Sequence, residues 1–162
     1  LTDFYRHEAS LYPGIAPLIR TLIAAPGVRL GLVTRNVTTD PEYTLRCLFA
    51  RHDIDMDAFD YLACIPLGGD KTASFREARA RLDINPARCY ACGDEYSDYV
   101  ASIGAGMYPF IVAYGAEDRL RLRKSFGVPD DFIHASPAEF AEKLLHTLGL
   151  DDVLAGPDGE HQ

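Results

Sequence analysis

The sequence predicts an α/β fold, a three-layer doubly wound parallel sheet with helices on both faces. Two observations carry this prediction. Short apolar runs alternate along the chain with longer segments whose apolar residues recur at helical spacing. The segments between them contain proline, glycine and helix-capping residues, which mark turns and helix ends. Such alternation forms βαβ units with right-handed crossovers, and these units assemble a mainly parallel sheet.

The chain opens with a helix and a strand. Residues 15–25 place their apolar side chains on one helical face, and Pro26 with Gly27 ends that helix. Residues 28–33 are apolar apart from Arg29, as expected of a strand that is covered on both faces.

The next helix has a clear start. Thr39 or Asp40 can cap it, Pro41 suits its first position, and it should run to about Phe49. The elements that follow are, in order, a strand over 61–65, a helix over 72–82, a strand over 88–92, a helix over 99–105, a strand over 108–113, a helix over 117–126 and a strand over 132–134.

The last helix begins with a capping box. Ser136 and Glu139 form the box, Pro137 takes the first helical position, and the helix should end near Gly149. Residues 151–162 have no periodicity, so we expect a disordered tail.

The composition is that of an ordinary globular domain of 162 residues, with 48% hydrophobic and 25% charged residues. A formal net charge of −8 disfavours nucleic acid and anionic membranes as partners. No apolar stretch reaches the roughly 18 residues that a membrane span requires. The four cysteines do not suggest a disulfide scaffold, and no secretory signal opens the chain, so we expect reduced thiols and a cytoplasmic location. No pattern indicates an oligomeric state.

Three segments carry the side chains that point to a chemistry. An apolar run ends at Thr34, a lone Lys71 follows Gly69-Asp70, and a second apolar run ends at Asp94, four residues before Asp98. The carboxyl ends of parallel strands meet at one edge of a sheet, so these groups should converge. A hydroxyl, an ammonium and two carboxylates suit a phosphoryl group and a magnesium ion, which favours oxygen ligands.

These segments resemble motifs II, III and IV of the haloacid dehalogenase superfamily, and the arrangement is similar to its phosphoglycolate-phosphatase-like branch. The resemblance extends from about residue 12 to about residue 148. It implies a hydrolase core that acts on a small phosphorylated metabolite, a phosphate monoester, through a phosphoaspartate intermediate. The same resemblance predicts Mg²⁺ as the cofactor.

The resemblance also assigns roles to residues. Thr34 and Lys71 would be catalytic residues that also bind the phosphoryl group. Backbone N–H groups of Arg35 and Asn36 would add donors to the same group. The metal ligands would be Asp94 and Asp98.

One part of the family pattern has no counterpart. The family nucleophile lies in an Asp-x-Asp motif after the first strand, at the centre of the sheet. Segment 2–5 has only one acid, and Asp55-Met56-Asp57 follows polar residues and comes after the threonine motif. We therefore expect that the first strand and most of the cap lie upstream of Leu1, and that this stretch of chain alone is inactive. On this reading residues 1–11 are a remnant of the cap or hinge helix and residues 12–150 are the core domain.

Two further kinds of function fit the sequence. A dehalogenase or a phosphomutase could use the same fold, and dependence on magnesium separates a phosphatase from a dehalogenase. A binding or interaction domain could have kept the fold and lost the nucleophile. An Asp-x-Asp motif after an apolar strand upstream would favour the enzyme.

Overall fold

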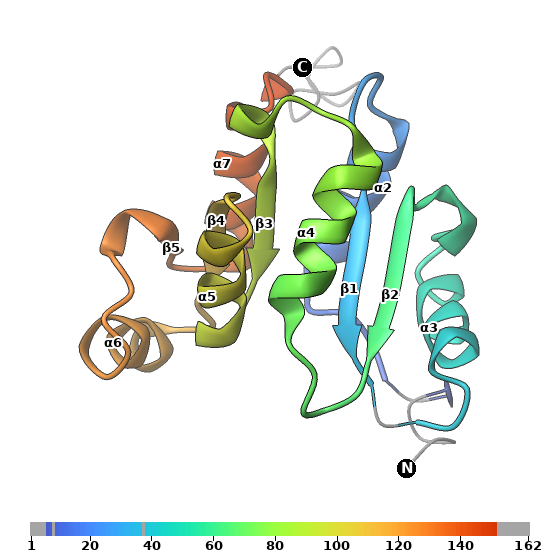
Figure 1. Ribbon diagram of the computed structural model, residues 1–162, viewed down its shortest axis with the longest axis horizontal. Coiled ribbons are helices and arrows are strands. Elements are labelled where there is room, and N and C mark those ends of the chain that lie inside the picture. Colours follow the sequence, from blue (N-terminus) through green and yellow to red (C-terminus); the bar gives the residue numbers. More distant parts are fainter. Residues whose placement is uncertain (1–5, 8, 37, 152–162) are drawn as a thin grey trace, which may run out of the picture.

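The strands form two small parallel sheets. The computed structural model describes residues 6–7, 9–36 and 38–151. Within them, one sheet pairs β1 (Gly31–Arg35) with β2 (Tyr61–Ile65), and the other has the order β3 (Tyr90–Gly93), β4 (Tyr108–Val112), β5 (Ile133–His134). All three strand pairings are parallel. The arrowheads of β1, β2 and β3 point the same way in Figure 1, so the two sheets share one carboxyl edge.

Helices cover both faces of these sheets. They are α2 (Ile15–Ala24), α3 (Pro41–Ala50), α4 (Lys71–Leu82), α5 (Tyr96–Gly104), α6 (Ala116–Lys124) and α7 (Pro137–Thr147). In Figure 1, α4 and α5 lie in front of the strands, and α2 and α7 lie behind them. This confirms the predicted α/β class with parallel strands between helical layers. None of the described helices is long and apolar enough to cross a membrane.

An interval separates β1 from β3. Tyr61 N–H donates to Leu30 C=O, and Asn36 N–H donates to Ile65 C=O, so the even-numbered residues of β1 direct their backbone groups to β2. Parallel ladders alternate, so the backbone groups of Gly31 and Val33 are directed away from β2, toward β3.

In the second sheet, β3 likewise has one edge that pairs with no strand among the described residues. Tyr108 N–H donates to Cys89 C=O, which by the same alternation directs the backbone of Tyr90 and Cys92 away from β4. Cys92 is exposed although it lies within a strand, whereas four of the five residues of β4 are buried. The two facing strand edges are therefore less covered than the middle of the second sheet.

Side chains above and below hold the two sheets together across this interval. On one face, Phe75 of α4 packs with Ala91 of β3 and with Val33 of β1. On the other face, Leu18 and Leu22 of α2 pack in the cluster that includes Phe110, Tyr90 and Leu30. The core thus joins the sheets even where their backbones do not pair.

Most predicted elements are present, and several boundaries differ. The strand over 61–65 has the predicted bounds, and Asp40 caps α3 by accepting a hydrogen bond from Tyr43 N–H at 3.3 Å. The strand predicted over 28–33 instead spans Gly31–Arg35, because its pairing with β2 begins beside Leu30. Residues 152–162 and 1–5, which include most of the predicted tail, lie outside the described part of the chain. The predicted domain boundaries remain a prediction.

The start of α5 also differs from its prediction. We expected a helix over 99–105, and it begins at Tyr96. The side chain of Asp98 accepts a hydrogen bond from Glu95 N–H at 3.1 Å, which satisfies a free donor of the first turn. Asp98 is thereby placed in the first turn of a helix instead of in a loop.

Candidate active site

The predicted site residues occupy the shared carboxyl edge of the sheets. Thr34 and Arg35 are the last two residues of β1, and Lys71 is the first residue of α4. Asp94 follows β3 directly, and Asp98 lies in the first turn of α5. Three strand-to-helix connections thus contribute to one edge.

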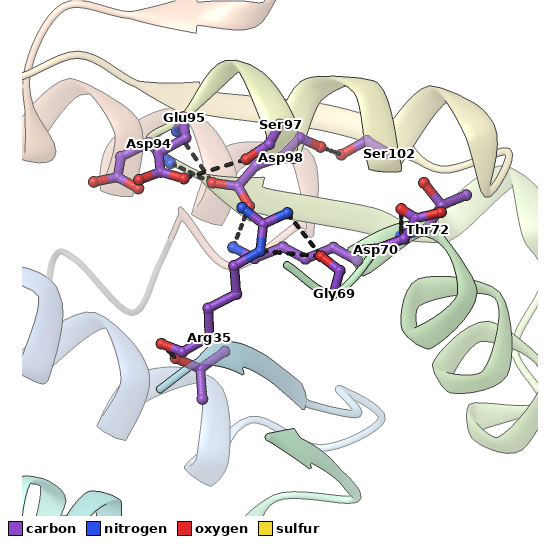
Figure 2. A network of polar contacts seen from close by, with 11 residues as sticks. Arg35, Gly69, Asp70, Thr72, Asp94, Glu95, Ser97, Asp98 and Ser102 are labelled. Carbon is purple, nitrogen blue, oxygen red and sulfur yellow. Dashed lines mark hydrogen bonds and ion pairs between the residues drawn. The ribbon is translucent and has the colours of Figure 1, made fainter. Parts of the chain in front are cut away.

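An ion pair joins two of these connections. Lys71 Nζ lies 2.6 Å from Asp98 Oδ1, and the side chains are 14% and 4% exposed. The other carboxylate oxygen of Asp98 accepts hydrogen bonds from the N–H groups of Asp94 (3.2 Å) and Glu95 (3.1 Å) (Figure 2). Burial strengthens this pair, because the low local dielectric weakens its screening. Asp98 therefore fixes both Lys71 and the backbone at the end of β3.

The fit of Asp98 requires a glycine beside it. A Cβ atom on Gly93 would lie 2.4 Å from Asp98 Cγ, which is far inside van der Waals contact. Behind Asp98, Ser102 Oγ donates to the Asp98 carbonyl at 2.6 Å, and Ser102 is fully buried. Neither position is predicted as a site residue from the sequence, although Gly93 directly precedes Asp94 and could have signalled a close approach.

Asp94 lies in a concentration of negative charge. Burial raises the pKa of its carboxyl group, and the nearby carboxylates of Asp98 and Glu95 raise it further, against a smaller opposite effect of Lys71. A divalent cation would relieve this repulsion, so the residues present fit a magnesium ion. Among the described residues, no cluster of three or more His, Cys, Asp or Glu forms a metal cage.

Arg35 reaches the loop before Lys71. Its Nε and one Nη both donate to the carbonyl of Gly69, at 3.2 and 3.0 Å (Figure 2). Asp70 then caps α4 by accepting from Thr72 N–H at 2.8 Å, and this bond lowers the pKa of the Asp70 carboxyl. The side chain of Arg35, for which the sequence predicted only a backbone role, thus joins β1 to the start of α4.

Thr34 and Asn36 are less closely connected to this network. The hydroxyl of Thr34 donates a long bond of 3.4 Å to the carbonyl of Arg35. The side-chain oxygen of Asn36 accepts from the N–H and the hydroxyl of Thr38, which holds it toward the following loop. No hydrogen bond or ion pair among the described residues links either side chain to Lys71, Asp94 or Asp98. Among the described residues, this weak bond is the one that the hydroxyl of Thr34 makes at the edge.

A tyrosine that the sequence did not single out also lies near this edge. Tyr114 follows β4, and its ring stacks on that of Tyr12 with centroids 4.1 Å apart. Burial raises the pKa of Tyr114 to about 12, and the Asp94 carboxylate contributes to that rise. Tyr114 therefore lies within electrostatic range of Asp94.

The comparisons with known proteins agree with this geometry. A family model described as haloacid dehalogenase-like hydrolase matches residues 3–106. The chain belongs to this family. A second model, described as HAD-hydrolase-like, matches residues 68–145. No curated protein and no solved structure matches the chain significantly.

The first family model covers all the predicted site residues at this edge, and the second covers those from Lys71 onward. Lys71, Asp94 and Asp98 all lie within the two matched ranges, and Thr34 lies within the first. The membership makes this haloacid dehalogenase-like protein a hydrolase of that superfamily.

Proposed function

We propose that this haloacid dehalogenase-like hydrolase is a magnesium-dependent phosphatase of the phosphoglycolate-phosphatase-like branch, acting on a small phosphate monoester. The observation that carries the proposal is the Lys71–Asp98 pair, which lies beside Asp94 at the end of β3. This arrangement combines a fixed ammonium group with carboxylate oxygens on neighbouring strand-to-helix connections. Phosphoryl transfer depends mainly on such positioning and charge stabilisation.

Each residue has a role in this proposal. Thr34 donates its hydroxyl to a phosphoryl oxygen, and the N–H groups of Arg35 and Asn36 add donors. Lys71 stabilises the negative charge that the phosphoryl group carries in the transition state.

Asp94 and Asp98 are the proposed metal ligands. Magnesium bound here would neutralise phosphoryl oxygens and orient them. Asp94 is the more available of the two carboxylates. Both oxygens of Asp98 are already engaged, one with Lys71 and one with two N–H groups, so a metal contact there would share the Lys71 interaction.

The nucleophile would come from a strand between β1 and β3. The backbone groups that those strands direct into the interval can pair with one more parallel strand, and its carboxyl end would lie between Thr34 and Asp94. An aspartate there would attack phosphorus, release the alcohol and form a phosphoaspartate, which water then hydrolyses. We propose that this strand lies upstream of Leu1.

The test uses the protein with its natural upstream sequence. A panel of phosphate monoesters is assayed with and without magnesium, for the wild type and for Asp94→Asn. We expect magnesium-dependent turnover that falls by about 100-fold or more in Asp94→Asn, as for the loss of a charged transition-state contact. Asp131→Asn, a change of the same type at an exposed position, is the control and should retain full activity.

Three results would contradict the proposal. Turnover by residues 1–162 alone at the rate of the longer protein would exclude an upstream nucleophile. Halide release from a 2-haloacid, added to the same assay without magnesium, would indicate a dehalogenase. Absence of turnover on every ester, with an upstream segment that lacks Asp-x-Asp, would indicate a binding domain.

The cellular location and the kind of partner are also proposals. The four cysteines, Cys47, Cys64, Cys89 and Cys92, are free thiols, which fits a reducing compartment and so a cytoplasmic location. The net charge of −8 supports a small metabolite as partner in place of nucleic acid or a membrane.

A further inference from the structure

The loop between β2 and α4 is fixed at two points on one residue, Gly69. The N–H of Gly69 donates to the carbonyl of Pro66 at 2.8 Å and closes a tight turn. The carbonyl of Gly69 accepts both N–H bonds of Arg35. A Cβ at Gly69 would lie 3.0 Å from Pro66 O and 3.3 Å from Ile65 Cβ, so the turn leaves little space for a side chain.

This loop leads directly to Lys71. Asp70 caps α4, and Lys71 is the first helical residue, two positions after the carbonyl that Arg35 holds. Lys71 then reaches across to Asp98 on α5. A continuous path of bonds therefore runs from β1 through Arg35, Gly69 and Lys71 to Asp98, and Figure 2 shows most of this path in one view.

The chemistry of Arg35 suits a fixed contact. A guanidinium group offers two parallel N–H donors, so it holds a carbonyl in one orientation, which a single ammonium does less well. Arg35 is half-buried, and it directly follows Thr34 in β1. The bond to Gly69 thus links the position of Thr34 to that of Lys71.

We infer that Arg35 is a positioning residue that places Lys71 at the candidate site by holding the Gly69 carbonyl. The inference rests on the proposed function only for its catalytic consequence, since the geometric effect on Lys71 can be measured by itself. Loss of the Arg35 side chain leaves the Gly69 carbonyl without this partner and frees the start of α4. Lys71 then spends more time away from Asp98.

The chain contains a matched control. Arg76 of α4 makes the same two-donor contact with a backbone carbonyl, that of Gly104, at 3.1 and 2.9 Å. Arg76→Met removes as many bonds as Arg35→Met, and its contact involves the C-terminal end of α5 instead of the loop before Lys71. The two variants therefore separate a general loss of stability from a specific effect on Lys71.

The first measurement is the acylation rate of Lys71 by acetic anhydride, followed by peptide mass spectrometry. Of the three lysines, Lys143 has a side chain that is 59% exposed and serves as the internal reference. Relative to Lys143, Lys71 should react about fivefold faster in Arg35→Met, because local opening becomes more populated. The ratio should not change in Arg76→Met. Arg35→Lys, which keeps one donor group, should give an intermediate ratio.

The second measurement is the binding of inorganic phosphate in the presence of magnesium, by calorimetry, to the protein with its upstream sequence. Arg35→Met should weaken this binding about fivefold, and Arg76→Met should leave it unchanged. An unchanged Lys71 acylation ratio in Arg35→Met would overturn the positioning role. If that ratio rises but the wild type binds no phosphate, the positioning role stands and the proposed phosphatase function fails.

Discussion

Lys71 Nζ and Asp98 Oδ1 lie 2.6 Å apart, and this contact joins the helix that follows β2 to the helix that follows β3. These helices follow strands of different sheets, whose facing strands are not paired with each other. The ion pair therefore contributes to the fold as well as to the candidate site. Because both side chains are largely buried, removing one partner leaves the other poorly solvated.

Asp98→Asn should destabilise the protein strongly. The change leaves the ammonium of Lys71 without its partner, and breaking a buried pair in this way costs about 3 kcal/mol. Asp130→Asn is the control, since Asp130 pairs with Arg119 at 2.9 Å on the surface, with side chains 48% and 37% exposed. That change should cost less than about 1 kcal/mol. Urea unfolding measures both, and equal small losses would contradict the buried role of Asp98.

Gly93→Ala should also destabilise the protein. The new Cβ would lie 2.4 Å from Asp98 Cγ, so Asp98 must move, and overpacking of this kind costs about 2 kcal/mol. At Gly31 the nearest atom to a new Cβ is Tyr61 Cβ at 3.5 Å, an ordinary contact. Gly31→Ala should therefore change stability by less than about 1 kcal/mol. A similar melting temperature for both variants would show that the space beside Asp98 is not limiting.

His134 should make stability depend on pH. It is 6% exposed, its ring stacks on Phe110, and its Nε2 is buried with no hydrogen-bond partner among the described residues. Burial lowers the pKa of this imidazole, while Glu139 acts in the opposite direction and Lys143 adds slightly to the lowering.

The sign of the effect follows from that lowered pKa. As the pH falls below about 6.5, the unfolded chain binds a proton at this position that the folded chain resists. Stability should fall by at most about 1.4 kcal/mol per pH unit per proton, until the pH reaches the lowered pKa of the folded state. His134→Phe should reduce the difference between urea midpoints at about pH 7.5 and about pH 5.5. The exposed His146 is the control position, and an equal reduction in His146→Phe would exclude this role for His134.

Ser136→Ala should weaken the start of α7. Ser136 Oγ accepts from Glu139 N–H at 3.2 Å, and Glu139 Oε2 accepts from Ala135 N–H at 2.8 Å. Two backbone N–H groups at the start of this helix therefore have side-chain partners. Loss of the cap should lower the free energy of unfolding by about 1 kcal/mol. Ser125→Ala, at an exposed position after α6, should have little effect. A thermal or urea unfolding comparison that shows no difference between the two would contradict the capping role.

Local signals predicted most of the fold correctly, although the local cap between Glu95 and Asp98 at the start of α5 was overlooked. Pro41 and Ser136 set their helix starts through nearby backbone groups, which a sequence pattern can reveal. The start of α5 was predicted three residues too late. The side chain of Asp98 both caps that helix and pairs with Lys71, which lies 27 positions away in the chain. Such a double role cannot be inferred from spacing alone.

The sequence by itself determined the order of strands and helices, the helix caps and the types of side chain at each strand end, because these depend on neighbouring residues. Only the tertiary structure decided which of those side chains meet. It joined Lys71 to Asp98 and gave Arg35 its contact with Gly69. The physical reason is that these contacts depend on how α4 and α5 pack over the two sheets, and a few tenths of a nanometre decide whether a bond forms.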